Sequence, residues 1–277
     1  MKISILGTNG FLSTAIAKYA VAEEWTLEMY GLQRPDDHDC NLFHQVDLMN
    51  SEMDCSTLLD SDLIVYAIGA GIQANLKEGY NLIYNLNVTV PVAICNKLKE
   101  LGYKGTFVTF GSVFEMGATT EQRFFSEKDV LTSLCPAPNE YTVSKRMLSS
   151  FVSSYKHDFT HWHFYIPTIY GAGENPKRLI PYVVNAIRHG EELHFTAGDQ
   201  VRQYVHVSEV PRMLDLALKK KLASGLYNIE GSETLTVKEI VTKIHHAMGR
   251  EVPEGCFWLR AAKLSRNENI LLWMARS

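Results

Sequence analysis

The sequence lacks paired cysteines and long apolar runs, and these two absences exclude several classes of protein. Its five cysteines stand singly, with no Cys-x-x-Cys pair, which argues against a disulfide framework and a zinc knuckle, and no metal site is expected. No stretch approaches the roughly 18 apolar residues of a membrane span, and the apolar run at residues 3–6 is too short for a signal peptide. We therefore expect a cytoplasmic protein with reduced thiols and no membrane contact.

An excess of charge of one sign is also missing. The formal net charge is −4, and the only local run of cations, Lys219 to Lys221, is predicted to close a helix. Nucleic acid is therefore not an expected partner. The 277 residues, 46% of them hydrophobic, suffice for one large domain or for a domain with an added lobe.

Short apolar runs alternate with helical patterns along the first 170 residues. We expect strands at 3–6, 27–32, 63–68, 105–110 and 162–166, with helices that include 86–98 and 141–155. Such alternation predicts an α/β fold with a doubly wound parallel sheet of the Rossmann type.

After Gly171 the alternation loosens, with a helix expected at 180–189 and a strand at 193–196. We therefore predict a dinucleotide-binding domain at 1–170 and a smaller C-terminal substrate-binding lobe at 171–277. A segment at about 203–221 is expected to return to the first domain. The sequence shows no internal repeat or low-complexity linker, so the lobe is expected to pack on the sheet.

The first predicted strand leads into a glycine turn that suits a pyrophosphate. Gly7 and Gly10 leave backbone amides bare at the start of a helix, and Ser13 stands where a third glycine is more common. The residues predicted to line this cofactor site are Gly7, Asn9, Gly10, Phe11 and Leu12.

The end of the second strand bears on the choice between NAD and NADP. No carboxylate stands at its tip, and Arg34 can pair with a 2′-phosphate, which favours NADP(H) over NAD(H). Alternatively, Arg34 is a solvated loop residue and Asp36 or Asp37 reads the ribose. Asp47 and Leu48 follow the expected third strand, where Asp47 is either an adenine contact or a plain N-cap.

Tyr-x-x-x-Lys occurs once, at Tyr141 and Lys145, at the start of a predicted helix. Ser112 lies just beyond a predicted strand, at the edge where parallel sheets keep their chemistry. Side chains at i and i+4 share a helix face, so Lys145 is expected to lower the pKa of Tyr141 and to hold the nicotinamide ribose. With the Ser112 hydroxyl, Tyr141 can then polarise and protonate a substrate carbonyl.

Several motifs, in chain order, resemble those of the extended short-chain dehydrogenases, in particular the NAD(P)-dependent epimerase/dehydratase superfamily. The resemblance covers residues 1 to about 245, and its segment 178–204 looks most like the 4-ketoreductases of deoxysugar pathways, such as CDP-abequose synthase and dTDP-sugar reductases. The matching positions are Gly7, Gly10, Asp62, Ala67, Ile68, Gly69, Asn87, Ser112, Gly117, Tyr141, Lys145, Pro167 to Gly171, and Arg202 to Val207.

The resemblance implies a role for each matching residue. Tyr141 would donate the proton, Lys145 would support it, Ser112 would anchor the carbonyl and Asn87 would assist. The dinucleotide would contact Ala67, Ile68, Gly69 and Pro167, whereas the nucleotide sugar would contact Arg178, Leu179, Phe195 and Arg202. The family also implies a homodimer formed through the helices at 86–98 and 141–155.

Some of these residues have structural alternatives. Asn87 could cap local backbone, Arg202 could form a surface ion pair, and Phe195 could belong to a core. The sequence departs from the family at Gln203, where an aspartate is usual, and at Met116, where a tyrosine is usual.

Three reactions share this scaffold. Family dehydratases follow the hydroxyl residue with an acidic pair, whereas Val113 and Phe114 follow Ser112 here. Family epimerases typically read NAD with an acid, whereas Arg34 favours exchangeable NADPH. Reduction of a keto group, at C4, by hydride transfer is therefore the leading interpretation; an epimerase and a non-catalytic NADP(H)-sensing regulator are the alternatives.

Overall fold

The structure is a computed structural model that describes residues 1–50, 52–72, 77–119, 121, 123–231 and 233–257. The last part of the predicted C-terminal lobe, residues 258–277, lies outside the described residues. None of the described helices is long and apolar enough to cross a membrane.

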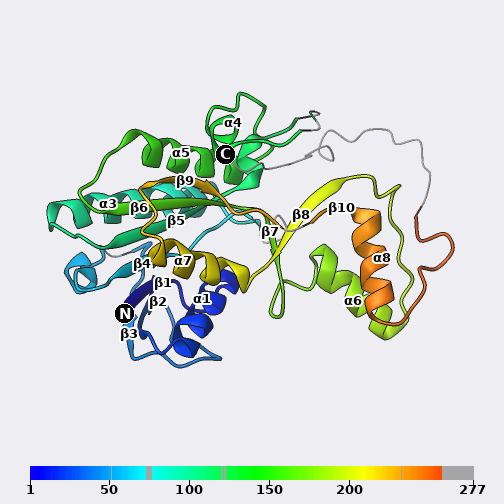
Figure 1. Cartoon of the computed structure of the whole chain (residues 1–277), viewed down its shortest axis with the longest axis horizontal. Helices are drawn as coiled ribbons and strands as arrows, with labels where there is room; N and C mark the ends of the chain where they lie inside the picture. Colours follow the sequence, from blue (N-terminus) through cyan, green and yellow to red (C-terminus); the bar gives the residue numbers. More distant parts are fainter. Residues whose placement is uncertain (51, 73–76, 120, 122, 232, 258–277) are drawn as a thin grey trace.

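A seven-stranded sheet forms the centre of the molecule, with every pair of neighbouring strands parallel (Figure 1). Its strand order is β3-β2-β1-β4-β5-β6-β9, so the order reverses beside β1, where β1 and β4 are neighbours. The strands are β1 (Lys2–Leu6), β2 (Thr26–Gly31), β3 (Leu42–Gln45), β4 (Leu63–Tyr66), β5 (Thr106–Ser112), β6 (Thr160–Ile166) and β9 (Gly225–Asn228). The predicted doubly wound parallel sheet is confirmed.

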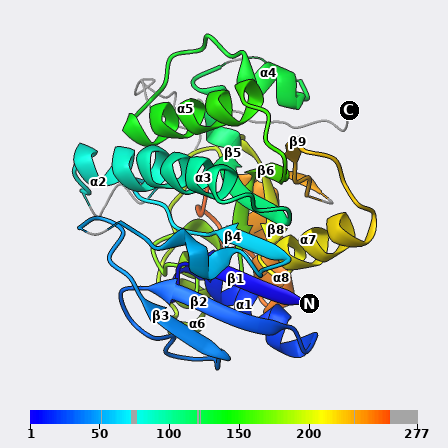
Figure 2. The same ribbon diagram turned by 90° about the vertical axis from the view of Figure 1, so that its left-hand side faces the viewer.

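Both faces of this sheet are buried, because successive side chains of each strand enter opposite cores. Ile3 and Ile5 face a core completed by α1 (Phe11–Ala22) and α7 (Glu209–Lys219). Ile64 and Phe107 face the other core, which α3 (Val90–Glu100) covers. Figure 2 shows α1 and α7 on one side of the sheet and α2, α3 and α5 on the other.

The helix expected at 86–98 is longer and interrupted. It begins as α2 (Tyr80–Tyr84), passes through a π-helical segment, η3 (Asn85–Thr89), and continues as α3. Such π segments change which side chains face inward, and they are frequent at functional sites. The other helices in the described part of this domain are η1 (Cys55–Leu58), η4 (Val113–Met116), α4 (Glu127–Leu131) and α5 (Glu140–Ser154).

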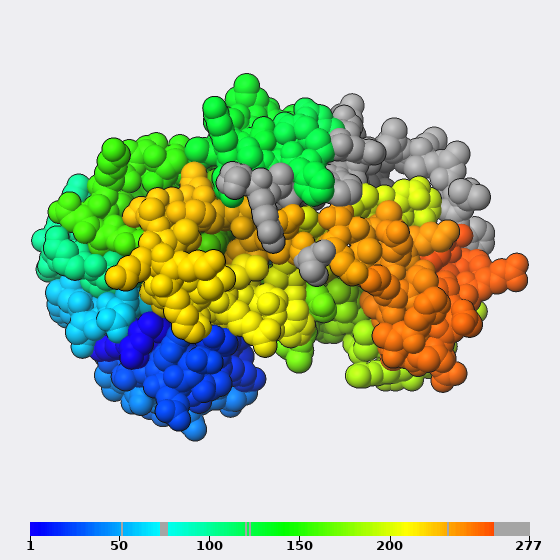
Figure 3. Space-filling view, in the orientation of Figure 1, coloured from blue at the N-terminus to red at the C-terminus, as the bar shows by residue number. Residues whose placement is uncertain are grey.

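A smaller lobe stands beyond the carboxyl end of the sheet (Figures 1 and 3). It contains α6 (Leu179–His189) and α8 (Val237–Ala247), joined to the main body by a second sheet of order β10-β8-β7. The strands of that sheet are β7 (Thr168–Tyr170), β8 (Val201–His206) and β10 (Thr234–Thr236).

The strand predicted at 193–196 is wrong. Only Phe195 pairs there, in an isolated bridge to Phe257, because Leu193 and Phe195 pack into the core between α6 and α8 instead of joining a sheet. The chain returns to the first domain as α7 and then as β9, which pairs with β6. The division of the chain at residue 170 stays a prediction.

Candidate active site

The glycine turn connects β1 to α1 in a conformation that needs glycine. Gly7 has a φ of +115°, and a Cβ there would lie 3.2 Å from Ile68 and 3.3 Å from the Ala67 carbonyl oxygen. Gly10 is the N-cap of α1, and because glycine has no side chain it leaves the first backbone amides of the helix uncovered. Ser13 stands at the position of the third glycine. It is buried, and its hydroxyl donates to the Gly10 carbonyl oxygen at 3.0 Å. A bare cradle at a helix N-terminus fits a dinucleotide pyrophosphate.

Asn9 joins this turn to the loop after β2. Its Nδ2 donates to the Arg34 carbonyl oxygen at 3.2 Å, and its Oδ1 accepts from the Asp36 amide at 3.0 Å. The exposed Arg34 guanidinium lies 5.9 Å from the centre of the Phe43 ring. Arg34 and Asp36, two of the three candidate readers of the ribose, therefore flank the turn. The third, Asp37, pairs with Lys18.

A pocket of about 290 Å³ opens beside the glycine turn at the carboxyl edge of the sheet. It brings together most of the residues predicted for the cofactor and for catalysis. Those lining it are Gly10, Phe11, Leu12, Ala67, Ile68, Gly69, Ser112, Tyr141, Lys145, Pro167 and Arg178. A wider groove of about 1230 Å³, lined by Asn9, Asp36, α1 and α7, shares Phe11 with this pocket.

Tyr141 lies in the first turn of α5, which Asn139 begins by accepting the Thr142 amide at 2.9 Å. Burial raises the pKa of Tyr141 to about 12, against the opposing effects of a Ser112 hydrogen bond and the Arg178 charge. The phenol therefore keeps its proton at neutral pH. That state is the one a proton donor needs.

Lys145 is buried beside Tyr141 and is held by a backbone carbonyl. Its ammonium donates to the Phe110 carbonyl oxygen at 2.9 Å and lies 5.9 Å from the centre of the Tyr141 ring. Burial lowers the pKa of Lys145, and the Glu115 charge opposes that shift. The net shift of the Tyr141 pKa is upward because burial of the phenol dominates, so a lowering by Lys145 stays a prediction.

Asn87 stands behind the pocket, within the π-helical segment. Its Oδ1 accepts from the Ala70 amide at 2.9 Å, and its Nδ2 donates to the Ala70 carbonyl and to Ser144 Oγ, both at 2.9 Å. The side chain thus holds the loop after β4 against α5. Asn87 is not among the described residues that line the pocket, and it instead positions the wall behind them.

Glu115 is a site residue that the sequence reading missed. The short helix η4 turns it back under Ser112, where Oε1 accepts from the Ser112 amide at 2.7 Å and Oε2 accepts from the Ser149 hydroxyl. It is completely buried, and burial raises its pKa to about 7, opposed by the Ser149 hydrogen bond. Its position could have been inferred from the Ser112-x-x-Glu115 spacing, which is that of a capping box.

Glu174 is a second residue that was missed. It lines the pocket and pairs with Arg178, whose Nε lies 2.7 Å from Oε1. Burial raises the pKa of Glu174, against the Arg178 charge. Arg178 and Arg202 both act on Tyr204: burial raises the pKa of Tyr204, and the two guanidinium charges oppose the shift. The charges of Arg178, which lines the pocket, and of Arg202 therefore both reach Tyr204.

The other predicted residues lie away from the pocket. Leu179 and Phe195 pack in the core between α6 and α8, and Leu48 packs on the core under α3. Asp47 accepts from the Met49 amide at 3.0 Å and from Asn50 Nδ2 at 2.8 Å, as an N-cap would. Their roles toward ligands stay predictions.

Comparisons with known proteins agree with this fold. A model of the NAD dependent epimerase/dehydratase family matches residues 3–229. A dTDP-D-glucose 4,6-dehydratase of Dictyostelium discoideum is 22% identical over 88% of the chain, which spans 61% of that relative, and CDP-abequose synthase of Salmonella muenchen is 21% identical over 90% of the chain and 82% of its own length. A UDP-glucose 4-epimerase structure from Thermotoga maritima superposes with a TM-score of 0.78 at 17% identity, covering 100% of this chain and 90% of that one.

The buried Glu115 makes stability depend on pH. Its pKa is raised on folding, so its favourable contribution is complete below about pH 4.5 and is lost as the pH rises through about 7. We expect the unfolding free energy of the wild type, relative to Glu115→Gln, to fall by on the order of 3 kcal/mol between pH 5 and pH 8. Urea denaturation across this range measures it, with the exposed Glu140→Gln as the matched control. A difference that does not change with pH would contradict the burial of a titrating carboxyl.

Proposed function

The chain belongs to the NAD dependent epimerase/dehydratase family, and from this premise we propose that it reduces a keto group, at C4, of a nucleotide-activated deoxysugar with NADPH. The observation that carries the proposal is the convergence of Ser112, Tyr141 and Lys145 on one pocket beside the glycine turn. The curated relative from Dictyostelium is longer than the region matched, so the activity is proposed for this chain and not transferred to it.

The side chains in the pocket can perform the proton half of such a reduction. Bound NADPH supplies the hydride. Tyr141, which keeps its proton at neutral pH, donates it to the carbonyl oxygen, while the Ser112 hydroxyl donates a hydrogen bond to the same oxygen. The Lys145 ammonium, held at the Phe110 carbonyl, keeps a positive charge below the developing phenolate and stabilises it.

Reduction is favoured over the other reactions of the family by the residues that follow Ser112. Phe114 lines the pocket, and Glu115 is turned away from it toward Ser149. Glu174 does line the pocket, but its carboxylate is paired with Arg178. An epimerase remains the alternative, and it differs in retaining its cofactor through the reaction. A non-catalytic regulator is disfavoured by the presence of both Tyr141 and Lys145.

A nucleotide sugar is supported by the cations around Tyr204. A diphosphate carries charge that two guanidinium groups can neutralise, and Arg178 lines the pocket while Arg202 lies on β8 beyond it. The homodimer also stays part of the proposal. Val143 and Met147, four residues apart on α5, are exposed apolar residues on one helix face, as a helix-mediated interface requires.

We predict that Tyr141→Phe lowers the rate of NADPH oxidation with a nucleotide 4-keto-6-deoxysugar by about 100-fold or more. The substitution removes the proton donor and leaves the ring in its buried place, so the Kd for NADPH should change little. Absorbance of NADPH follows the reaction. Wild-type activity in this variant would exclude Tyr141 as the donor. Conversion of an unoxidised nucleotide sugar by the wild-type protein, without added NADPH, would instead favour the epimerase.

Arg34→Ala tests the choice of cofactor. If Arg34 pairs with the 2′-phosphate, the variant should bind NADPH more weakly by about 1.5–3 kcal/mol and should bind NADH almost as before. Fluorescence titration of both cofactors gives the two constants, and the exposed Arg188→Ala on α6 controls for loss of one surface cation. Equal losses for the two cofactors would point to Asp36 or Asp37 as the ribose reader.

Arg202→Ala tests the substrate class. Loss of a partly desolvated contact to a diphosphate should raise KM for the nucleotide sugar by about 30-fold to 150-fold, equivalent to about 2–3 kcal/mol. The Kd for NADPH should not change, because Arg202 lies on β8 and the cofactor is expected to bind at the glycine turn between β1 and α1. An unchanged KM in steady-state kinetics would mean that no phosphate of the substrate reaches Arg202, and the pocket would then serve a ketone of another class.

A further inference from the structure

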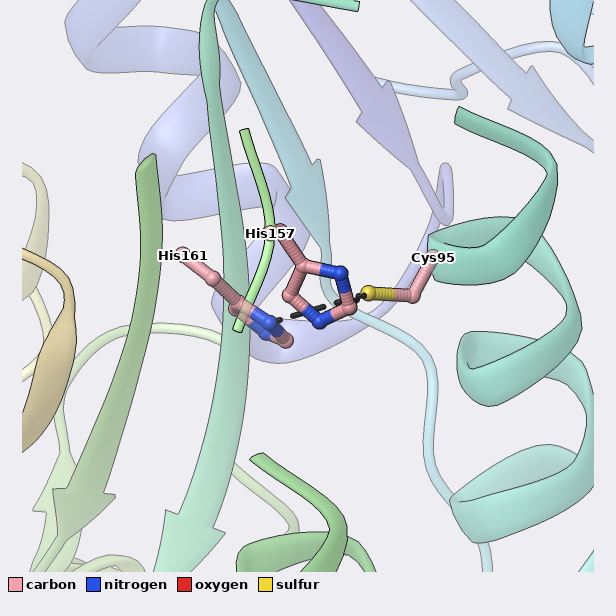
Figure 4. A group of neighbouring side chains, drawn as sticks. All are labelled: Cys95, His157 and His161. Atoms are coloured by element: carbon pink, nitrogen blue, oxygen red, sulfur yellow. Dashed lines mark hydrogen bonds between the residues drawn. The ribbon is translucent and has the colours of Figure 1, made fainter. Parts of the chain in front are cut away.

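Three metal-ligating side chains meet on the face of the sheet under α3, away from the active-site pocket (Figure 4). Cys95 projects from α3, His161 from β6, and His157 from the segment between α5 and β6. Cys95 is completely buried, His161 is 3% exposed, and His157 is half-buried at the rim. The proposed reaction uses none of the three.

The spacing of the ligand atoms matches a tetrahedral metal site. Cys95 Sγ lies 3.3 Å from His157 Nε2 and 3.7 Å from His161 Nδ1, and all three atoms lie within 4.8 Å of one another. Zinc bonds of about 2.3 Å to sulfur and 2.0–2.1 Å to nitrogen, at tetrahedral angles, separate sulfur from nitrogen by about 3.5–3.6 Å. The two observed sulfur–nitrogen distances bracket that value.

A buried chain of hydrogen bonds sets the state of His161. Above its pKa of about 7, Glu115 is ionised and accepts from the Ser149 hydroxyl, so in that state Ser149 Oγ accepts from His163 Nε2, at 2.9 Å. His163 Nδ1 then accepts from Thr109 Oγ1 at 2.8 Å, and Thr109 Oγ1 accepts from His161 Nε2 at 3.0 Å.

This order leaves His161 Nδ1 without a proton and aims its lone pair at the cluster. Burial also lowers the pKa of His161 to about 3, so the ring stays neutral. A histidine that donates its other N–H to a fixed partner is the usual arrangement of a metal ligand. Thr109 is that partner here.

His157 is held in place and offers the route of entry. Its ring stacks on Phe159 with centroids 4.8 Å apart and planes 13° apart. Two charges act on it: Lys99, which is exposed on α3, and the exposed Asp158. Burial, reinforced by Lys99, lowers the pKa of His157, so its ring is neutral near pH 7 and able to donate a lone pair.

We propose that Cys95, His157 and His161 bind one divalent transition-metal ion of the zinc class, which ties α3 to the start of β6. A thiolate with two imidazoles suits Zn²⁺ or Co²⁺ and does not suit Mg²⁺ or Ca²⁺, which require oxygen ligands. On binding, the Cys95 S–H bond breaks, its proton leaves to solvent, and the sulfur forms the bond to the metal. The fourth position is taken by water or buffer.

Titration of the metal-stripped, tag-free chain with Co²⁺ at pH 8 tests the site. We expect a near-ultraviolet sulfur-to-cobalt charge-transfer band that saturates at one equivalent and disappears when Zn²⁺ is added. Because one thiol proton is released, the apparent Kd should fall about tenfold for each unit of rising pH. The readout is spectroscopic, so it is independent of any enzymatic activity.

Variants assign the band to the cluster. Cys95→Ser should abolish it, and His157→Gln, at the rim where folding is least at risk, should weaken Co²⁺ binding at least tenfold. Cys135→Ser and the exposed His189→Gln are matched controls that should leave it unchanged. Absence of the band, or its persistence in both cluster variants, would mean that the three side chains form a hydrogen-bonded cluster only.

Thermal unfolding gives a second measurement. A hundredfold excess of Zn²⁺ over Kd should raise the Tm of the wild type by roughly 5–10 °C and leave that of His157→Gln unchanged. Glu115→Gln tests the tautomer. Its amide must keep an oxygen toward the Ser112 amide and so offers N–H to Ser149, which reverses the chain and protonates His161 Nδ1. Co²⁺ binding should weaken by about 10–100-fold, and an unchanged affinity would overturn the role given to the chain.

Discussion

The site depends on two buried groups of opposite charge, the Lys145 ammonium and the Glu115 carboxylate. Neither is paired directly with the other: Lys145 donates to the Phe110 carbonyl, and Glu115 accepts from Ser112 and Ser149. Burial of one charge alone would neutralise it, whereas each here favours the ionised state of the other. The pair therefore fixes the end of β5 against α5, and with it the two hydroxyls that meet the substrate.

The close approach of Glu115 to β6 also explains why residue 111 on β5 is a glycine. A Cβ on Gly111 would lie 2.5 Å from both Glu115 Oε1 and His163 Nε2. Only a glycine on β5 lets the carboxylate and the imidazole share this space, and both hydrogen bonds to Ser149 depend on that approach. The polar layer between the sheet and α5 is therefore built around one missing side chain.

The sequence predicted the parts of the site that depend on order along the chain. The turn at Gly7, the hydroxyl at Ser112 and the pair on α5 were found because strand ends and i, i+4 spacing place them without knowledge of packing. The strand at 193–196 was predicted wrongly, because its apolar residues serve a helix-helix core and no periodicity separates the two in so short a run. Glu115 was missed because its direction is decided by a single short helical turn.

The histidine-cysteine cluster lay beyond sequence reasoning for a different reason. Cys95 is 62 residues from His157 and 66 from His161, so no local spacing marks the three as ligands, and the expected absence of a metal rested on local spacing alone. The hydrogen-bond chain that ends at Glu115 gives this distance a consequence. All hydrogen bonds in the chain point the same way, so the ionised state of Glu115, which leaves His161 Nδ1 without a proton, favours metal binding. Because linkage between two sites is reciprocal, a bound metal must in turn favour the ionised state of Glu115. An ion at the amino end of β6 would then lower the pKa of the carboxyl at the end of β5, and the two ends of the sheet would not titrate independently.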